Sequence, residues 1–292
     1  IDVYPSLRDS INIRRWIRRI DRTIRAAGTE ANAEYPPLEF VAGEYRSLFF
    51  WSLVARFAGR QPRVTIIDDG TASLRIDRSS SAAPPSARER SKALAAAMFG
   101  LSIGKDLPIE FFSVYDLRKK LGRHDTFVSN TYERCKANMA SLPSDDSTVY
   151  IIGSPILEAG VITGDDIGLT KAMIAAIRHE MPAHKIVYVP HRRERQEKLH
   201  SVQTLVEVRS LGYPFEAFSA MEKKNVRFVA GFYSSVFDNL IAIYGSGVQI
   251  TSYTLPAHLV SNEWKDFVDS VYKNYQRHQS GNFQISPIGA HE

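Results

Sequence analysis

Three short polar motifs in the sequence each follow an apolar, strand-like run. They are DDG at residues 68–70, PH at 190–191 and SS at 234–235. In open α/β sheets, ligands bind at the carboxyl ends of the strands. The motifs lie far apart in the chain, but this rule allows all three to converge on one cleft.

The DDG motif carries two adjacent carboxylates at the end of a strand. If the strand geometry continues, Asp68 and Asp69 point to opposite sides, so one can face a cleft while the other anchors the turn. Gly70 permits a tight bend. An aspartate aimed at a hydroxyl can act as a general base. The alternative interpretation is a turn before a helix, for which Asp-Gly is a common signal.

His191 follows Pro190 at the end of the run KIVYV. A histidine at a strand end can protonate a leaving group or bind a phosphate as imidazolium. The arginines that follow it raise the local potential and are expected at a helix start, where some of them can face an anionic ligand. The alternative is an exposed loop histidine within a solvated run of charges.

Ser234 and Ser235 stand at a predicted strand-to-helix junction. Hydroxyl and backbone N–H groups at a helix N-terminus form an anion site, although a serine N-cap is equally expected for helix stability alone. Gly153 and Ser154 form another strand-end turn. Glu216, in YPFEAF, can bind a ribose diol or act as the carboxylate of a helix start.

Composition sets the broad class of the protein. The chain has 292 residues, of which 44% are hydrophobic, which is enough for two domains. Its formal charge of +5 favours anionic partners. Cys135 is the single cysteine, so no intramolecular disulfide can form, which fits a cytoplasmic location. No uninterrupted apolar run reaches the ~20 residues of a membrane span, and no acidic or His/Cys cluster requires a metal.

The elements that position these motifs alternate between strands and helices. This alternation predicts an α/β protein with parallel sheets. Residues 126–146 are polar and irregular, so we expect an interdomain connection there, with domains at 1–146 and 147–292.

The opening segment has apolar residues at helical spacing, with arginines on the other face. These apolar residues are Ile13, Trp16, Ile17, Ile20 and Ile24. We predict a surface helix packed on the core. The alternative is a basic amphipathic helix that lies on an anionic membrane.

Taken in order, the motifs resemble those of bacterial sialyltransferases. DDG after a buried strand, then GSP-x-LE-x-G, a strand ending in PHRRE, then P-x-E, and SS before a helix are similar to that family's acidic-acidic-Gly, His-Pro and Ser-Ser/Thr motifs. The likeness covers about residues 38–255 and is most evident for the lipooligosaccharide sialyltransferases and the related polysialyltransferases. Two departures stand out. Arg192 replaces the family's proline, and no clear first strand precedes Leu38, so an N-terminal domain that is incomplete at its start is expected.

The resemblance implies a GT-B fold, in which two Rossmann-like domains with parallel sheets face a central cleft. The N-terminal domain would bind the acceptor and the C-terminal domain the donor. The implied enzyme is an inverting, metal-independent glycosyltransferase without a cofactor. It moves sialic acid or a related nonulosonic acid from a CMP-sugar to a glycan or glycolipid hydroxyl, in polysaccharide biosynthesis for the bacterial cell surface. The expected location is cytoplasmic, with peripheral association at the cytoplasmic face of the inner membrane as a further expectation from the basic first helix.

The resemblance also implies roles for single residues. Asp68 would deprotonate the acceptor hydroxyl, with support from Asp69 and Gly70, and His191 would protonate or stabilise the departing phosphate of CMP. The residues implied to bind the CMP part of the donor are Ser234, Ser235, Glu216, Gly153, Ser154 and Pro190.

The sequence leaves three alternatives open. A GT-B protein that binds nucleotides or acts as a scaffold could have lost catalysis. A GT-B transferase could use another nucleotide sugar, such as CMP-Kdo or a UDP-sugar. Nucleic-acid binding is the third, and the sequence lacks the pattern of stacking aromatics and basic residues that a known module would have.

Overall fold

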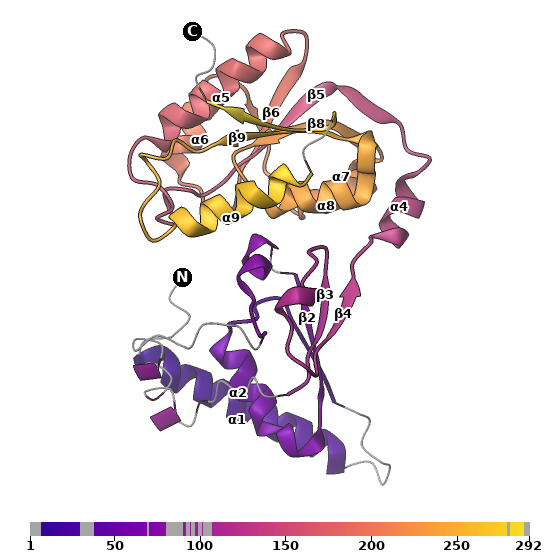
Figure 1. Cartoon of the computed structure of the whole chain (residues 1–292), viewed down its shortest axis with the longest axis vertical. Coiled ribbons are helices and arrows are strands. Elements are labelled where there is room, and N and C mark those ends of the chain that lie inside the picture. The colour runs from indigo at the N-terminus through magenta and orange to yellow at the C-terminus, as the bar shows by residue number, and fades with distance from the viewer. Residues whose placement is uncertain are drawn as a thin grey trace. The chain divides into compact units, whose positions relative to one another are not determined.

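The structure is a computed structural model, and it describes residues 7–29, 38–68, 70–79, 90, 91, 94, 97, 98, 101, 107–278 and 281–288. It is an α/β protein with two sheets, of four and six strands, and the paired strands in both sheets run parallel. The chain divides into two compact units, which we call unit 1 (residues 1–130) and unit 2 (residues 131–292) (Figure 1). The α/β class predicted from the sequence is confirmed.

Unit 1 has a sheet whose strands follow the chain order β1-β2-β3-β4. The strands are β1 (Glu39–Ala42), β2 (Arg63–Ile67), β3 (Glu110–Ser113) and β4 (Thr126–Ser129). Helices α1 (Leu7–Thr29) and α2 (Leu48–Arg56) belong to this unit, as do the 3-10 turns Ala58–Arg60, Gly70–Arg75 and Arg118–Lys120. Trp51 and Val54 of α2 are fully buried in one cluster with Ile66 and Phe111 of the sheet.

The apolar face of α1 packs on α2. Ile17 is buried there, with Ile13, Ile20 and Ile24 beside it, and Asp21 pairs with Arg56 of α2 at 3.0 Å. The predicted surface helix is therefore confirmed, because the apolar stripe contacts the protein.

Trp16 is the exception on α1. Its side chain is 56% exposed, and the guanidinium of Arg19 lies 5.6 Å from the centre of its ring. The described part of the chain contains no helix that could cross a membrane by its length and apolar character.

Unit 2 has a sheet in the order β10-β9-β8-β5-β6-β7. Numbered within the unit, this is the 3-2-1-4-5-6 order of a doubly wound, Rossmann-like sheet. The strands are β5 (Ser144–Ile152), β6 (Lys185–Val189), β7 (Glu207–Val208), β8 (Asn225–Gly231), β9 (Gln249–Thr254) and β10 (Phe283–Pro287).

Helices cover both faces of this sheet. Because crossovers between parallel strands are right-handed, α5 and α6 lie on one face while α8 and α9 lie on the other (Figure 1). The helices of unit 2 are α4 (Glu133–Met139), α5 (Asp166–Glu180), α6 (Gln196–Gln203), α7 (Phe218–Glu222), α8 (Ser235–Tyr244) and α9 (Lys265–Gln276), with 3-10 turns at Phe215–Ala217 and Gly245–Gly247.

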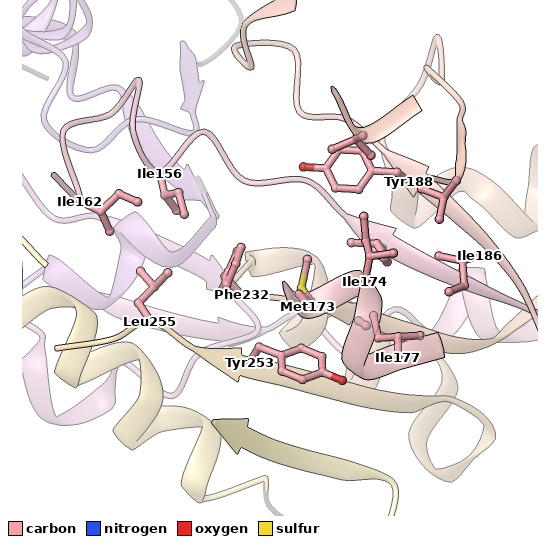
Figure 2. Close-up of a cluster of buried hydrophobic side chains, with 14 of the residues drawn as sticks. Ile156, Ile162, Met173, Ile174, Ile177, Ile186, Tyr188, Phe232, Tyr253 and Leu255 are labelled. Atoms are coloured by element: carbon pink, nitrogen blue, oxygen red, sulfur yellow. The ribbon is translucent and has the colours of Figure 1, made fainter. Parts of the chain in front are cut away.

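The core of unit 2 explains the apolar runs in its central strands β5, β6 and β8. A parallel sheet that is covered on both faces buries both sets of side chains. Met173, Ile174 and Ile177 of α5 pack in one cluster with Ile186 and Tyr188 of β6 (Figure 2). This packing of α5 against the sheet holds β6 in place and so helps to position its carboxyl end.

Residues 126–146 differ from the irregular connection that the sequence predicted. They contain β4, α4 and the first residues of β5, and the two units separate after Asn130. The polar composition has a local cause. The strand β4 lies at the edge of its sheet with mostly exposed side chains, and the short α4 buries Met139 alone.

Candidate functional site

A cavity of about 740 Å³ lies in unit 2 at the carboxyl ends of β5, β6 and β8. Its walls are the turns after these three strands, the start of α6, and the segment 210–216 that follows β7. The strand order reverses between β5 and β8, because successive strands step one way from β5 and the other way from β8. The connections therefore diverge at this point and leave a crevice above the strand ends.

The cavity brings together most of the donor-side residues predicted from the sequence. Those that line it are Gly153, Pro190, His191, Glu216, Ser234 and Ser235. Ser154 is not part of the lining. It is buried, and its hydroxyl donates to the carbonyl of Tyr233 at 3.0 Å, so it joins the turn after β5 to the turn after β8.

The two serines at the start of α8 do different things. Ser234 is the N-cap, and its Oγ accepts the N–H of Val236 at 3.2 Å, while its own N–H donates to the hydroxyl of Tyr275 at 2.9 Å. Ser235 is the first residue of the helix, and among the described residues its hydroxyl has no hydrogen-bond partner. The helix-cap interpretation thus holds for Ser234, whereas Ser235 offers a free hydroxyl at the positive end of the helix.

Glu216 faces the cavity from a 3-10 turn. The side-chain amide of Asn239, on α8, donates to Oε1 of Glu216 at 2.7 Å. Phe215 anchors this turn from below by stacking on Phe218, with ring centroids 5.3 Å apart. Glu216 is therefore held in place through one oxygen, and its second oxygen can accept hydrogen bonds from a ligand.

His191 is held at both its backbone and its ring. Its N–H donates to Oε2 of Glu194 at 2.8 Å, and its Nδ1 accepts the N–H of Arg193 at 3.2 Å. The proton of the neutral ring is therefore assigned to Nε2. Burial lowers the pKa of His191, Glu194 opposes the shift, and the charges of Arg192 and Arg193 add to it. At neutral pH, His191 thus presents an N–H donor and not a cation.

A buried ion pair lies behind this turn. The side chains of Glu194 and Lys198 are fully buried, and Nζ of Lys198 is 2.5 Å from Oε1 of Glu194. Tyr188 also donates its hydroxyl to Glu194, at 2.7 Å. Lys198 further donates to the carbonyl of Ser154 at 3.3 Å and lies 3.6 Å from Oδ2 of the buried Asp166. One network therefore links the turns after β5 and β6 to the starts of α5 and α6.

This network was not predicted from the sequence. The signal for it is the four-residue spacing of Glu194 and Lys198, which favours an ion pair on one helix face. Of the arginines expected at the helix start, Arg195 occupies the N-cap position of α6 and pairs with Asp166. Arg192 lies in the preceding turn and lines the cavity, whereas Arg193 does not.

The loop 210–216 was also not predicted as part of the site. Tyr213 lines the cavity, and its hydroxyl donates to Glu222 at 2.5 Å. Burial and this carboxylate raise the pKa of Tyr213 to about 12. Arg209 pairs with the same Glu222 at 2.6 Å. The signal in the sequence is the Gly-Tyr-Pro turn, which indicates a loop but not which surface it faces.

Asp68 follows β2 in unit 1. Its Oδ1 accepts the hydroxyl of Ser113 at 2.5 Å, and its Oδ2 accepts the N–H of Val114 at 2.7 Å. Burial raises the pKa of Asp68, and these hydrogen bonds partly oppose the shift. Gly70 has a φ of 60° and begins a 3-10 turn, so the tight bend expected there is present. Asp69 lies outside the described residues.

The chain matches no protein-family model, and a search of curated proteins finds no match for it. Within the described ranges, no group of three or more His, Cys, Asp or Glu residues is placed to hold a metal ion. The resemblance to the sialyltransferases therefore stays a prediction from the ordered sequence motifs.

Gly153 is predicted to tolerate no side chain. A Cβ at this position would lie 2.2 Å from Oε2 of Glu194 and 2.9 Å from the nitrogen of His191. We expect Gly153→Ala to destabilise the protein by about 1–3 kcal/mol, because the buried carboxylate must shift. Urea unfolding measures this. Gly212→Ala is the matched control, because Gly212 lines the same cavity and nothing lies within 4 Å of its Cβ position. Equal midpoints for Gly153→Ala and the wild type would contradict the close contact.

Lys198 is predicted to stabilise unit 2 by compensating Glu194. Lys198→Met leaves a buried carboxylate without its cation, so we expect a loss of about 3–5 kcal/mol. Glu194→Gln combined with Lys198→Met should recover part of this loss, and a double-mutant cycle in urea measures the coupling. Lys171→Met, at an exposed position of α5, is the control. Additive effects of the two substitutions would show that the pair is not coupled.

Proposed function

We propose that the protein is an inverting glycosyltransferase of the GT-B type that resembles the bacterial sialyltransferases. It would move sialic acid or a related nonulosonic acid from a CMP-sugar to a glycan hydroxyl. The observation that carries the proposal is the cavity at the switch point of the unit 2 sheet. His191, Glu216 and Ser235 come from three distant parts of the sequence, and all line it.

The chemistry of the lining suits a nucleotide. A volume of about 740 Å³ falls within the range of roughly 300–1,000 Å³ that small-molecule sites have. The second oxygen of Glu216 can accept hydrogen bonds from the two ribose hydroxyls. Ser235 and the N-terminus of α8 can hold a phosphate, since hydroxyl and N–H donors meet there with the positive end of the helix dipole.

In the proposed reaction, the acceptor hydroxyl attacks the anomeric carbon while the bond from that carbon to the phosphate oxygen of CMP breaks. The hydroxyl proton passes to Asp68, whose raised pKa makes it a better base than an ordinary aspartate. Negative charge develops on the departing phosphate. The Nε2–H of His191 and the donors at Ser235 would stabilise that charge.

The division into units supports the same proposal. Unit 2 has a six-stranded doubly wound sheet, a type of sheet that often binds nucleotides, and unit 1 has a four-stranded parallel sheet with Asp68 after β2. Unit 1 would bind the acceptor. The proposed setting is the cytoplasm, where lipid-linked bacterial glycans are built.

A second candidate is a nucleotide-binding protein of the same fold without transferase activity. Two observations favour it. Both oxygens of Asp68 accept hydrogen bonds from the protein itself, and Arg192 replaces the proline that follows the histidine in the family it resembles. This protein would bind CMP but release no CMP from a CMP-sugar.

CMP is predicted to be the nucleotide that stabilises the protein. A ligand that binds only the folded state raises the melting temperature, so a thermal-shift series with CMP, UMP, UDP, GDP and AMP tests this. Ser235→Ala should weaken CMP binding about tenfold or more, because a hydrogen bond to a charged group is lost. Ser270→Ala, on the exposed side of α9, is the control. Stabilisation by UDP or GDP instead of CMP would rule out the CMP-sugar donor.

Asp68→Asn is predicted to abolish transfer while leaving CMP binding unchanged. The loss should be about 10²–10⁴-fold in kcat, as is typical when a general base is removed. In the wild type, kcat/KM should fall as the pH drops through the pKa of Asp68, which lies above the ordinary value of 3.8. CMP release in the presence of glycan acceptors measures both. Asp116→Asn, an exposed carboxylate of the same unit, is the control. Retained turnover in Asp68→Asn would remove Asp68 from the role of base.

A further inference from the structure

The cavity in unit 2 has an unusual charge balance for a site that would bind an anion. Of the described residues that line it, Arg192 is the one that carries a guanidinium or ammonium group, while Glu194 and Glu216 carry carboxylates. Lys198 compensates Glu194 from behind. Glu216 is held by the neutral amide of Asn239 and has no such cation. Without Arg192, the lining would therefore be net negative toward a ligand.

Arg192 also has no partner for its guanidinium among the described residues. Its side chain is exposed, and among the described residues it makes no hydrogen bond or ion pair. Arg195, three residues further on, is instead bound within the protein. It pairs with Asp166, and its guanidinium lies 3.8 Å from Glu158. Arg193 is exposed as well but does not line the cavity. Arg192 can therefore contact a ligand in the cavity, whereas Arg193 cannot.

The backbone at Arg192 is well placed for this task. The preceding His191 is fixed by its N–H bond to the buried Glu194, and the following Arg193 is fixed by its N–H bond to the ring of His191. A ligand would therefore order only the side chain of Arg192, not the turn. A guanidinium offers a planar set of donors that matches the paired oxygens of a phosphate or a carboxylate.

We propose that Arg192 is the anion-recognising residue of the unit 2 cavity and binds an anionic oxygen group of the nucleotide-sugar donor. This inference rests on the proposed function and adds a specificity residue to it. The donor of that reaction has two anionic groups, the phosphate diester and the carboxylate of the sugar. The Nε2–H of His191 can donate a hydrogen bond, but the lowered pKa leaves that ring uncharged at neutral pH. Arg192 then supplies the positive charge.

The test is a calorimetric titration of wild type, Arg192→Gln, Arg192→Lys and Arg193→Gln with cytidine, CMP and CMP-sialic acid. We expect Arg192→Gln to weaken the binding of CMP-sialic acid about tenfold to a hundredfold, because a charged hydrogen bond is lost. The binding of cytidine, which carries no anionic group, should be unchanged. Arg193→Gln should match the wild type, and Arg192→Lys should retain part of the affinity. The loss in Arg192→Gln should shrink at high salt, because screening weakens the wild-type contact.

The ligands separate the two anionic groups. A loss seen with CMP as well as CMP-sialic acid assigns Arg192 to the phosphate, and a loss seen with CMP-sialic acid alone assigns it to the sugar carboxylate. Arg192→Gln that binds both ligands like the wild type overturns the inference and leaves the proposed function standing.

If the wild type binds UDP and not CMP, the sialyltransferase proposal fails. A loss of UDP binding in Arg192→Gln would then still support the role of Arg192, and unchanged UDP binding would overturn it. Unchanged thermal unfolding of Arg192→Gln establishes that the variant is folded.

Discussion

The buried carboxylate of Glu194 organises the cavity of unit 2 through the groups that compensate it. A charge removed from water costs several kcal/mol unless it is paired and hydrogen-bonded. Here Lys198, the hydroxyl of Tyr188 and the N–H of His191 all converge on its two oxygens. The bond from the N–H of His191 to Glu194 shapes the cavity, because it holds the turn after β6 against Gly153. The side of that turn that lines the cavity is therefore held in place by contacts within the protein itself.

The sheet determines the position of the turn after β6. The strands β5, β6 and β8 run parallel and end at the same edge, and the strand order reverses between β5 and β8. The helix α8 starts directly above that reversal, so the free hydroxyl of Ser235 and the turn of His191 border one crevice. Packing of both sheet faces against helices fixes the heights of these strand ends, and so the distances between the groups that would contact a phosphate.

The two residues proposed for catalysis have pKa values shifted in opposite directions by the same cause. Burial disfavours the charged form of any group, so the pKa of Asp68 is raised and that of His191 is lowered. For Asp68 this strengthens a base. For His191 it leaves a neutral ring that can donate a hydrogen bond, so in the proposed site Arg192 supplies the positive charge. The proposed roles of Asp68, His191 and Arg192 thus follow from desolvation and from the position of the Arg192 guanidinium.

The sequence by itself determined the α/β class, the placement of polar motifs at strand ends and the packed face of α1, because these depend on local hydrophobic periodicity. It also placed Glu194 four residues before Lys198. Only the tertiary structure decided that this pair is buried, that Arg192 faces the cavity while Arg193 does not, and that Ser154 lies behind the lining. Sheet order, burial and the direction of a turn arise from contacts between residues far apart in the chain, and local sequence patterns do not encode such contacts. For the same reason the polar pattern of residues 126–146 predicted a linker, although Thr126–Ser129 form the edge strand β4 and pair with β3.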